Sequence, residues 1–356
     1  KFKTSLFYFR TGLFASLISF LISNNKNFVR YLFLSLSISF FLLIVDGYYQ
    51  YFNSTNLLGQ VVPGSWDGTR LSSLFGDELI LGSYLSRLLP IFIALYFLKQ
   101  KYFKFDDLVF FIVFSLVCVL IYLSGERASF VFLFLTLFTL FIFNYNNKYF
   151  NLFFLLVLVI IYIFAITNPK LNYRMFKSVL SNDLKIINNE NKIVLPKIGE
   201  IIIFSDGHNT LIRTAYNMFK DKPILGVGPN MFRMKCSDER YIFDKNKHYC
   251  DTHPHNFYIQ IAAETGVIGL MLIFLFFFHI LYKILKNFFY IFNKKKTHNN
   301  YEIFILMSIM ITIFPFVTNG NFFNSWLVNI YSIGLGFYIN YNYKENNFFK
   351  KLHVEK

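Results

Sequence analysis

Residues 252–269 read Thr-His-Pro-His-Asn-Phe-Tyr-Ile-Gln-Ile-Ala-Ala-Glu-Thr-Gly-Val-Ile-Gly, and they join a long polar segment to an apolar run. We expect Pro254 to be the first residue of a helix, where its missing N–H costs nothing. His255 and Asn256 would then lie in the first turn, beside free backbone N–H groups and the positive end of the helix dipole. The stretch therefore predicts a polar site at the mouth of a membrane-spanning helix.

The composition places the chain among polytopic membrane proteins. Of 356 residues, 55% are hydrophobic and only 15% are charged. The apolar residues form runs of about 20, the length that crosses a ~30 Å hydrocarbon core. We expect an all-α, polytopic integral membrane protein with about nine transmembrane helices. The apolar runs lie near 5–23, 29–46, 78–98, 107–124, 128–144, 149–167, 256–285, 302–319 and 322–341.

The net charge is +15. Most Lys and Arg lie in short loops and tails, where they determine which side of the membrane each loop occupies. Nucleic acid is excluded as a partner, since no basic surface is interleaved with exposed aromatic residues. Basic residues after the first, third, fifth and seventh runs and in the tail are expected on the cytoplasmic side. Lys1 and Lys3 break this rule, and helices preceding Lys1 would explain the exception.

Three segments follow from this topology: an amino-terminal transmembrane bundle (1–167), a periplasmic loop domain (168–254), and carboxy-terminal transmembrane helices with a cytoplasmic tail (255–356). Within the loop domain, residues 192–204 are compatible with a small hairpin. Residues 208–220 carry apolar side chains at helical spacing and predict an amphipathic helix.

Beyond the histidines, Asn256, Gln260 and Glu264 form a polar stripe at four-residue spacing. An acid about two turns into a span is expected to face the protein interior or a water-filled cavity. A parallel face of small residues favours the close approach of another helix. This face consists of Ala262, Gly266 and Gly269. The alternative for His253 and His255 is that they only cap the helix at a wet interface.

His255-Asn256 followed by Gly266-Val267-Ile268-Gly269 resembles the signature of the O-antigen ligase and O-antigen polymerase superfamily. The run from Arg213 to Arg233 and the run Ser124-Gly-Glu-Arg-Ala-Ser129 are similar to that family as well. The large external loop that is expected before the third-from-last helix is another feature that resembles this family.

The resemblance implies a helical fold related to the GT-C glycosyltransferases, in the bacterial inner membrane, with the active site facing the periplasm. It implies an undecaprenyl-pyrophosphate-linked glycan as donor, a glycan or lipid A core as acceptor, surrounding membrane lipids, and no metal or other cofactor. Carried over residue by residue, Arg127 and Arg213 match the arginines that hold the donor pyrophosphate, and His255 matches the essential histidine. The family has roughly a dozen spans, so fewer are expected here.

Such a transfer needs stabilisation of the charge on the departing pyrophosphate, which arginine can supply bidentately. His255 would activate or orient the acceptor hydroxyl. Two alternatives remain: Arg127 as an interfacial arginine paired with Glu126, and Arg213 as a solvated position on the loop helix.

A second polar group contains Arg70 and Arg87. Arg87 falls ~14 Å below the start of the third run at 1.5 Å per residue, and a charge at that depth is a functional candidate. We expect Arg70 and Arg87 to bind the donor substrate or to act in gating. We expect His253, Asn256 and Glu264 to bind substrate as well. Pairing of Arg87 with Glu264 or Asp77 is the structural alternative.

Cys236 and Cys250 both fall in the external loop, where an oxidising compartment permits a disulfide between them. Two free thiols are the alternative. A zinc cluster of Cys250, Asp251, His253 and His255 is less favoured, because Pro254 stiffens the run and no second ligand pair has metal spacing. We therefore expect no metal.

Three classes of function remain after this reasoning. A glycan transferase of the ligase or polymerase type is favoured. A transporter or flippase for lipid-linked oligosaccharide would show paired broken helices and titratable groups near the membrane centre. A membrane scaffold would not need polar groups that converge on one helix end.

Overall fold

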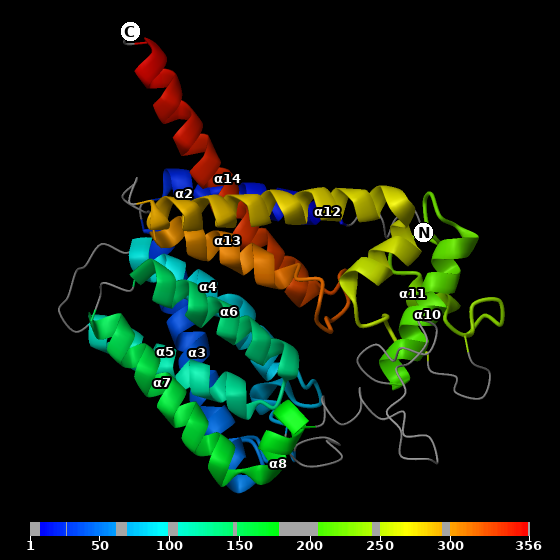
Figure 1. Ribbon diagram of the computed structural model, residues 1–356, viewed down its shortest axis with the longest axis horizontal. Coiled ribbons are helices and arrows are strands. Elements are labelled where there is room, and N and C mark those ends of the chain that lie inside the picture. The colour runs from blue at the N-terminus through cyan, green and yellow to red at the C-terminus, as the bar shows by residue number, and fades with distance from the viewer. Residues whose placement is uncertain are drawn as a thin grey trace. The chain divides into compact units, whose positions relative to one another are not determined.

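The computed structural model describes residues 8–25, 27–61, 70–98, 106–144, 148–177, 206–243, 250–293 and 300–354. These residues are helical apart from loops and one isolated antiparallel bridge between Thr55 and Val61 (Figure 1). The predicted all-α class is confirmed. The hairpin expected near 192–204 lies outside the described residues.

Each predicted apolar run overlaps one helix. These helices are α2 (Phe9–Asn24), α3 (Phe28–Asn53), α4 (Leu81–Leu98), α5 (Asp106–Leu123), α6 (Arg127–Asn144), α7 (Lys148–Thr167), α12 (Phe257–Phe292), α13 (Asn300–Thr312) and α14 (Ser325–Val354). Five segments of the described chain are long and apolar enough to cross a membrane: Phe28–Asn53, Leu81–Leu98, Arg127–Asn144, Phe150–Thr167 and Phe257–Ile291. The chain is an integral membrane protein, and the figure of about nine spans stays an expectation.

The last two helices differ from the runs predicted at 302–319 and 322–341. Helix α13 ends at Thr312 and α14 begins at Ser325, so the residues between them form an irregular segment. Pro315 restricts the backbone of Phe314 and lacks an N–H, which prevents the helix from continuing. This segment becomes part of the site described below.

Shorter elements connect the long helices. They are η1 (Ser73–Phe75), α8 (Pro169–Asn172), the π-turn η2 (Tyr173–Lys177), α10 (Asp206–Asp221) and α11 (Phe232–Lys235). Helix α10 confirms the amphipathic helix predicted over 208–220. Its apolar face buries Leu211, Ala215 and Met218 in a small core with Phe232 and Tyr241.

The chain forms two compact units. The site unit comprises Lys1–Gly12, Phe176–His279 and Ile313–Asn329, and the bundle unit comprises Leu13–Met175, Ile280–Thr312 and Ile330–Lys356. The division into three consecutive segments expected from the sequence stays a prediction.

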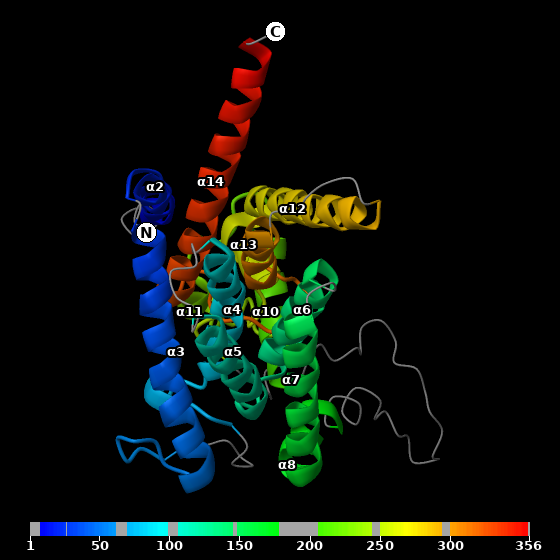
Figure 2. The ribbon, with the colours of Figure 1, turned by 90° about the vertical axis from the view of Figure 1, so that its left-hand side faces the viewer.

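In the bundle unit, α4 is the central helix. It contacts α3, α5, α6 and α13, and Figure 2 shows α4 and α5 between α3 and α7. A Cβ added at Gly82 would lie 2.2 Å from the Ser124 hydroxyl and 3.1 Å from the Ser129 Cβ. This close approach places the start of α4 directly against the turn between α5 and α6.

In the site unit, α12 is broken at Gly266, which has φ 69° and ψ −165° (Figure 1). The loop at 223–228 inserts at the break. The Val227 N–H donates to the Ala263 carbonyl at 2.9 Å, the Gly228 N–H to the Glu264 carbonyl at 2.9 Å, and the Val267 N–H to the Pro223 carbonyl at 2.7 Å. These bonds replace the helical bonds that the break removes.

The small-residue face of this helix was expected to allow the close approach of a second helix, but at Gly266 it packs against a loop. A Cβ added at Gly266 would lie 2.2 Å from the Ile224 carbonyl oxygen, and one at Gly226 would lie 2.3 Å from the Glu264 carbonyl carbon. A loop backbone, not a second helix, approaches at Gly266. Both glycines also have positive φ, which a side chain would disfavour.

Candidate functional site

The start of α12 corrects the prediction made for Pro254. The helix begins at Phe257, and the Asn256 side-chain oxygen accepts from the N–H groups of Tyr258 at 3.1 Å and Ile259 at 3.2 Å. Asn256 is therefore the N-cap, because asparagine satisfies the free N–H groups of the first turn. His255 lies outside the helix, with φ 57° in the left-handed region.

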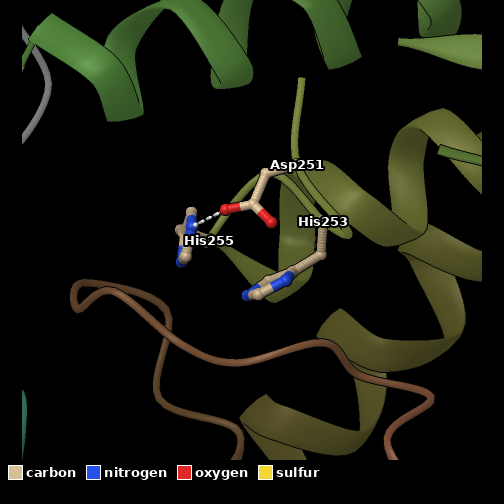
Figure 3. Close-up of side chains that lie close together, drawn as sticks. All are labelled: Asp251, His253 and His255. Atoms are coloured by element: carbon tan, nitrogen blue, oxygen red, sulfur yellow. Dashed lines mark hydrogen bonds and ion pairs between the residues drawn. The ribbon is translucent and has the colours of Figure 1, made fainter. Parts of the chain in front are cut away.

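His255 is paired with Asp251. Its Nε2 atom lies 3.0 Å from Oδ2 of Asp251 (Figure 3). Burial raises the pKa of Asp251, but the Thr252 N–H and the His255 ring together bring it below its usual 3.8. The ionised carboxylate can only accept, so Nε2 carries the proton. With the proton on Nε2, Nδ1 is the ring nitrogen that can accept a proton.

The neighbouring histidine, His253, is held neutral. Its pKa is lowered to about 4 by burial and by His255, against the opposing effect of Asp251. Its Nε2 lies 3.2 Å from the Asn319 carbonyl oxygen and its Nδ1 lies 2.8 Å from the Thr252 hydroxyl. Because a carbonyl only accepts, Nε2 donates and Nδ1 accepts.

The irregular segment between α13 and α14 holds this histidine loop in place. The Asn319 N–H donates to the His255 carbonyl at 2.9 Å, and the Asn256 amide donates to the Pro315 carbonyl at 2.9 Å. The carbonyl of Asn319 accepts from His253. Both histidines are therefore positioned by backbone groups about 60 residues away in the sequence.

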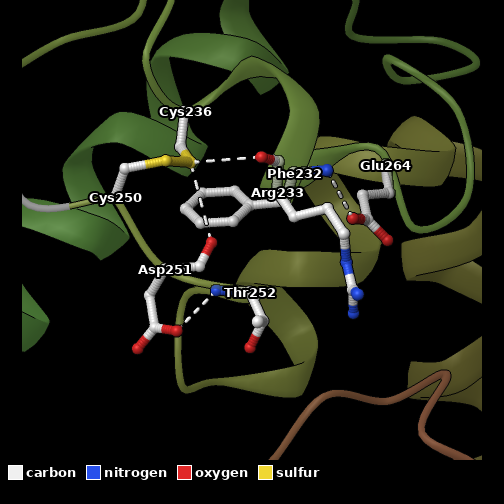
Figure 4. The surroundings of a disulfide bond; sticks show 7 residues. All are labelled: Phe232, Arg233, Cys236, Cys250, Asp251, Thr252 and Glu264. Carbon is white, nitrogen blue, oxygen red and sulfur yellow. Dashed lines mark hydrogen bonds between the residues drawn. A yellow bond between two sulfur atoms is a disulfide. The ribbon is translucent and has the colours of Figure 1, made fainter.

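A disulfide fixes the other side of the loop. Cys236 and Cys250 are bonded, with Cα atoms 5.4 Å apart, and Cys250 directly precedes Asp251 (Figure 4). Cys236 follows α11 and is buried in the core beneath α10. The bond ties the Asp251 backbone to that core.

Glu264 faces the interior of the site unit, as the polar stripe predicted, and it is fully buried. Its carboxylate accepts from the Phe232 N–H at 2.8 Å (Figure 4). It also accepts from the Asn230 N–H at 2.8 Å and from the Gln260 amide at 3.3 Å. Gln260 in turn donates to Asn321 at 2.8 Å. Through these hydrogen bonds Glu264 stabilises the turn at 230–232.

Helix α10 adds a third histidine that the sequence reasoning missed. The ring of His208 lies 4.8 Å from the ring of His255, edge to face. Arg213 follows about 7.5 Å further along the same helix. Its Nε donates to Asn209 at 3.2 Å, and its guanidinium lies 4.7 Å from the centre of the Phe243 ring. The site unit thus carries both the histidines and Arg213.

Arg233 is a further cation that was given no role from the sequence. It is exposed on α11, and its charge contributes to the lowered pKa of His253. Figure 4 shows its side chain extending past Phe232.

The other predicted arginines belong to the bundle unit. Arg127 begins α6, and its Nε donates to the Arg174 carbonyl at 3.1 Å. Arg70 donates to the Leu79 carbonyl at 2.6 Å. Arg87 is buried, donates to the Ser83 carbonyl at 3.3 Å and to the Ser83 hydroxyl, and lies 4.7 Å from the centre of the Phe132 ring. Since α4 begins at Leu81, Arg87 lies about 9 Å along it, and not ~14 Å.

Glu126 organises the start of α4. Its two oxygens accept from the N–H groups of Gly82 at 2.8 Å and Ser83 at 3.1 Å, and one also accepts from Ser129 at 3.1 Å. Burial raises the pKa of Glu126, although the positive charges of Arg70 and Arg87 oppose the rise. A carboxylate at a helix N-terminus stabilises that helix.

Asp251, His253 and His255 also have the residue types of a metal site, and their ligand atoms lie within 4.8 Å of one another. Cys250 cannot be a ligand while it is bonded to Cys236. The four-residue zinc cluster considered from the sequence is thereby reduced to three residues.

Comparison with known proteins found a match to one family model. Residues 110–274 match the family model described as O-antigen ligase. The match runs from α5 through α10 and the histidine loop to a point just past the break in α12. No curated protein and no solved structure matches the chain. Residues 110–274, which carry Arg127, Arg213 and the His255-Asn256 motif, support membership of the O-antigen ligase and polymerase family.

Proposed function

We propose that the protein transfers a glycan from undecaprenyl pyrophosphate to a hydroxyl acceptor at the periplasmic face of the inner membrane. The acceptor is another lipid-linked repeat in a polymerase or lipid A core in a ligase. The observation that carries the proposal is the His255–Asp251 pair at 3.0 Å within the segment matched to the family. An imidazole whose Nε2–H is held by an ionised carboxylate is the arrangement of a general base.

The proposed step forms one bond and breaks another. The acceptor oxygen attacks C1 of the donor sugar, and the C1–O bond to the pyrophosphate breaks. The electron pair of that bond stays on the pyrophosphate oxygen, and the acceptor proton passes to Nδ1 of His255. Asp251 stabilises the resulting imidazolium. Proton transfer to a general base such as His255 commonly contributes 10²–10⁴-fold in rate.

Arginines stabilise the leaving group in this mechanism. Arg127 and Arg213 offer planar pairs of N–H donors that match phosphate oxygens. Arg70 and Arg87 contribute positive charge beside the start of α4, and His253 and Asn256 shape the acceptor side of the loop. Charge stabilisation of this kind needs no metal or other cofactor.

The test uses purified protein in liposomes that contain a lipid-linked glycan and an acceptor. Wild type forms a new glycosidic bond, and His255→Ala abolishes it. His279→Ala is the matched control, because His279 is exposed on α12 outside the site. Full activity of His255→Ala would refute the assignment. Movement of the glycan across the bilayer without a new bond would favour the transporter instead.

The acceptor is identified separately in a deletion strain. Mass spectrometry of the surface glycan distinguishes the two classes. Loss of polymer length indicates a polymerase, and polymer that stays on its lipid carrier indicates a ligase.

A further inference from the structure

Three side chains of the histidine loop have the types and the spacing of a transition-metal site. The ligand atoms of Asp251, His253 and His255 lie within 4.8 Å of one another (Figure 3). Nε2 of His255 and Oδ2 of Asp251 are 3.0 Å apart. This is close to the roughly 3.3 Å between two ligand atoms of a tetrahedral zinc ion whose bonds are about 2.0 Å long. Two imidazoles and one carboxylate, with water as the fourth ligand, are a set that zinc commonly takes.

The ring of His253 is held in the way that a metal-bound histidine is held. Its Nε2–H donates to the Asn319 carbonyl at 3.2 Å, and its Nδ1 lies 2.8 Å from the Thr252 hydroxyl. Histidines that bind a metal almost always donate the other ring N–H to a carboxylate or a backbone carbonyl, which fixes the ring and its tautomer. The lone pair of His253 is therefore on Nδ1, where a metal ion can replace the hydroxyl.

The loop that carries these residues is fixed on both sides and open to solvent. The Cys236–Cys250 disulfide anchors the residue before Asp251, and the Asn319 N–H donates to the His255 carbonyl at 2.9 Å. The side chains of Asp251 and His255 are both partly exposed. A dissolved ion can therefore reach ligands that are already assembled, and pre-organisation of this kind reduces the entropy lost on binding.

We infer that Oδ2 of Asp251, Nδ1 of His253 and Nε2 of His255 form an inhibitory binding site for Zn²⁺, an ion that is not a cofactor here. A neutral imidazole has one N–H and one lone pair. When Nε2 of His255 binds zinc, the ring proton moves from Nε2 to Nδ1, so the ring gains and loses none. Nδ1 is the atom that takes the acceptor proton in the proposed transfer, and the zinc-bound protein has no base. The inhibition rests on the proposed function, whereas the binding of zinc does not.

The first measurement is equilibrium dialysis of the purified full chain, without a polyhistidine tag, against Zn²⁺. Wild type binds one ion tightly, and X-ray absorption at the zinc edge shows nitrogen and oxygen ligands at about 2.0–2.2 Å. His253→Ala and the isosteric Asp251→Asn each weaken binding at least about tenfold, because even the hydrogen-bond partners of a ligand contribute 10- to 100-fold. His279→Ala, at an exposed position of α12, binds as wild type. Equal affinities for all three variants, or a sulfur ligand at about 2.3 Å, overturn the site.

The second measurement is glycan transfer at increasing free Zn²⁺. Transfer by wild type falls with the same concentration dependence as zinc binding and returns when EDTA is added. His253→Ala needs at least about tenfold more zinc for half inhibition, relative to its own activity without zinc. If zinc binds through these ligands without slowing transfer, the inhibition is refuted. If zinc binds but the zinc-free protein transfers no glycan, the metal site stands and the proposed function fails.

Discussion

The role of Asp251 gives the sharpest prediction. Asp251→Asn replaces the ionised partner of His255 with a neutral amide of the same shape. The bond that changes is the one between Nε2 and Oδ2, at 3.0 Å. The amide can turn its NH₂ group toward Nε2, which would move the ring proton to Nδ1 and remove the base.

The magnitude follows from the distance and the exposure of the pair. The side chains of His255 and Asp251 are 28% and 46% exposed, so solvent screens their attraction. At ~4 Å between charges, Coulomb energies run from about 1 kcal/mol in water to about 4 kcal/mol near a protein surface. We take about 1–2 kcal/mol for the imidazolium formed in the reaction, which lowers kcat roughly 5- to 30-fold.

The assay measures kcat for transfer at saturating donor between about pH 7 and 9, where Asp251 stays ionised because its pKa lies below its usual 3.8. The deficit of Asp251→Asn is expected throughout this range. Asp238→Asn is the control, since Asp238 is an acid of the same unit, paired with Arg240 on the surface, and such pairs contribute little. A folded Asp251→Asn protein with the wild-type kcat would refute the reasoning.

Three further predictions concern the frame of the site. Cys236→Ser opens the loop closed at Cys250 and lowers the free energy of unfolding by about 3 kcal/mol, measured by denaturant titration with and without reductant. Gly266→Ala forces a Cβ to within 2.2 Å of a carbonyl oxygen and lowers Tm, whereas Gly207→Ala, with nothing within 4 Å, leaves Tm unchanged or raises it. Dialysis against EDTA leaves glycan transfer unchanged. Added Zn²⁺ inhibits glycan transfer, because it binds the lone pairs of the histidines in the loop. Loss of activity on chelation would instead assign a metal to that loop.

Local rules of sequence predicted much of this structure. The apolar runs gave the helices, and the spacing of Leu211, Ala215 and Met218 gave α10. The start of α12 was misplaced by three residues, because two local signals competed: Pro254 as a first helical residue and Asn256 as a cap. The cap prevails, since it satisfies two N–H groups.

Contacts between distant residues could not be predicted in this way. His208 meets His255 across 47 positions of the chain, and no periodicity connects them. Likewise, Arg174 bonds to Gly125 across 49 positions. Gly266 was recognised as a site of close approach, but whether a helix or a loop approaches depends on the tertiary structure.

The backbone of His255 offers a way to separate function from stability. This residue has φ 57°, a conformation that costs an L-residue roughly 1–2 kcal/mol and glycine little. A strained residue that is not glycine points to a need for its side chain. His255→Ala and His255→Gly both lose the bond to Asp251, but only alanine keeps the strain.

We therefore expect both variants to be inactive, with His255→Gly as stable as His255→Ala or up to about 1 kcal/mol more stable, once the extra flexibility of unfolded glycine is subtracted. Denaturant unfolding in detergent compares the two, and glycan transfer in liposomes gives the activity. If His255 only closed the turn before α12, the glycine variant would retain activity. That single result would remove the imidazole from the mechanism while leaving the fold as described.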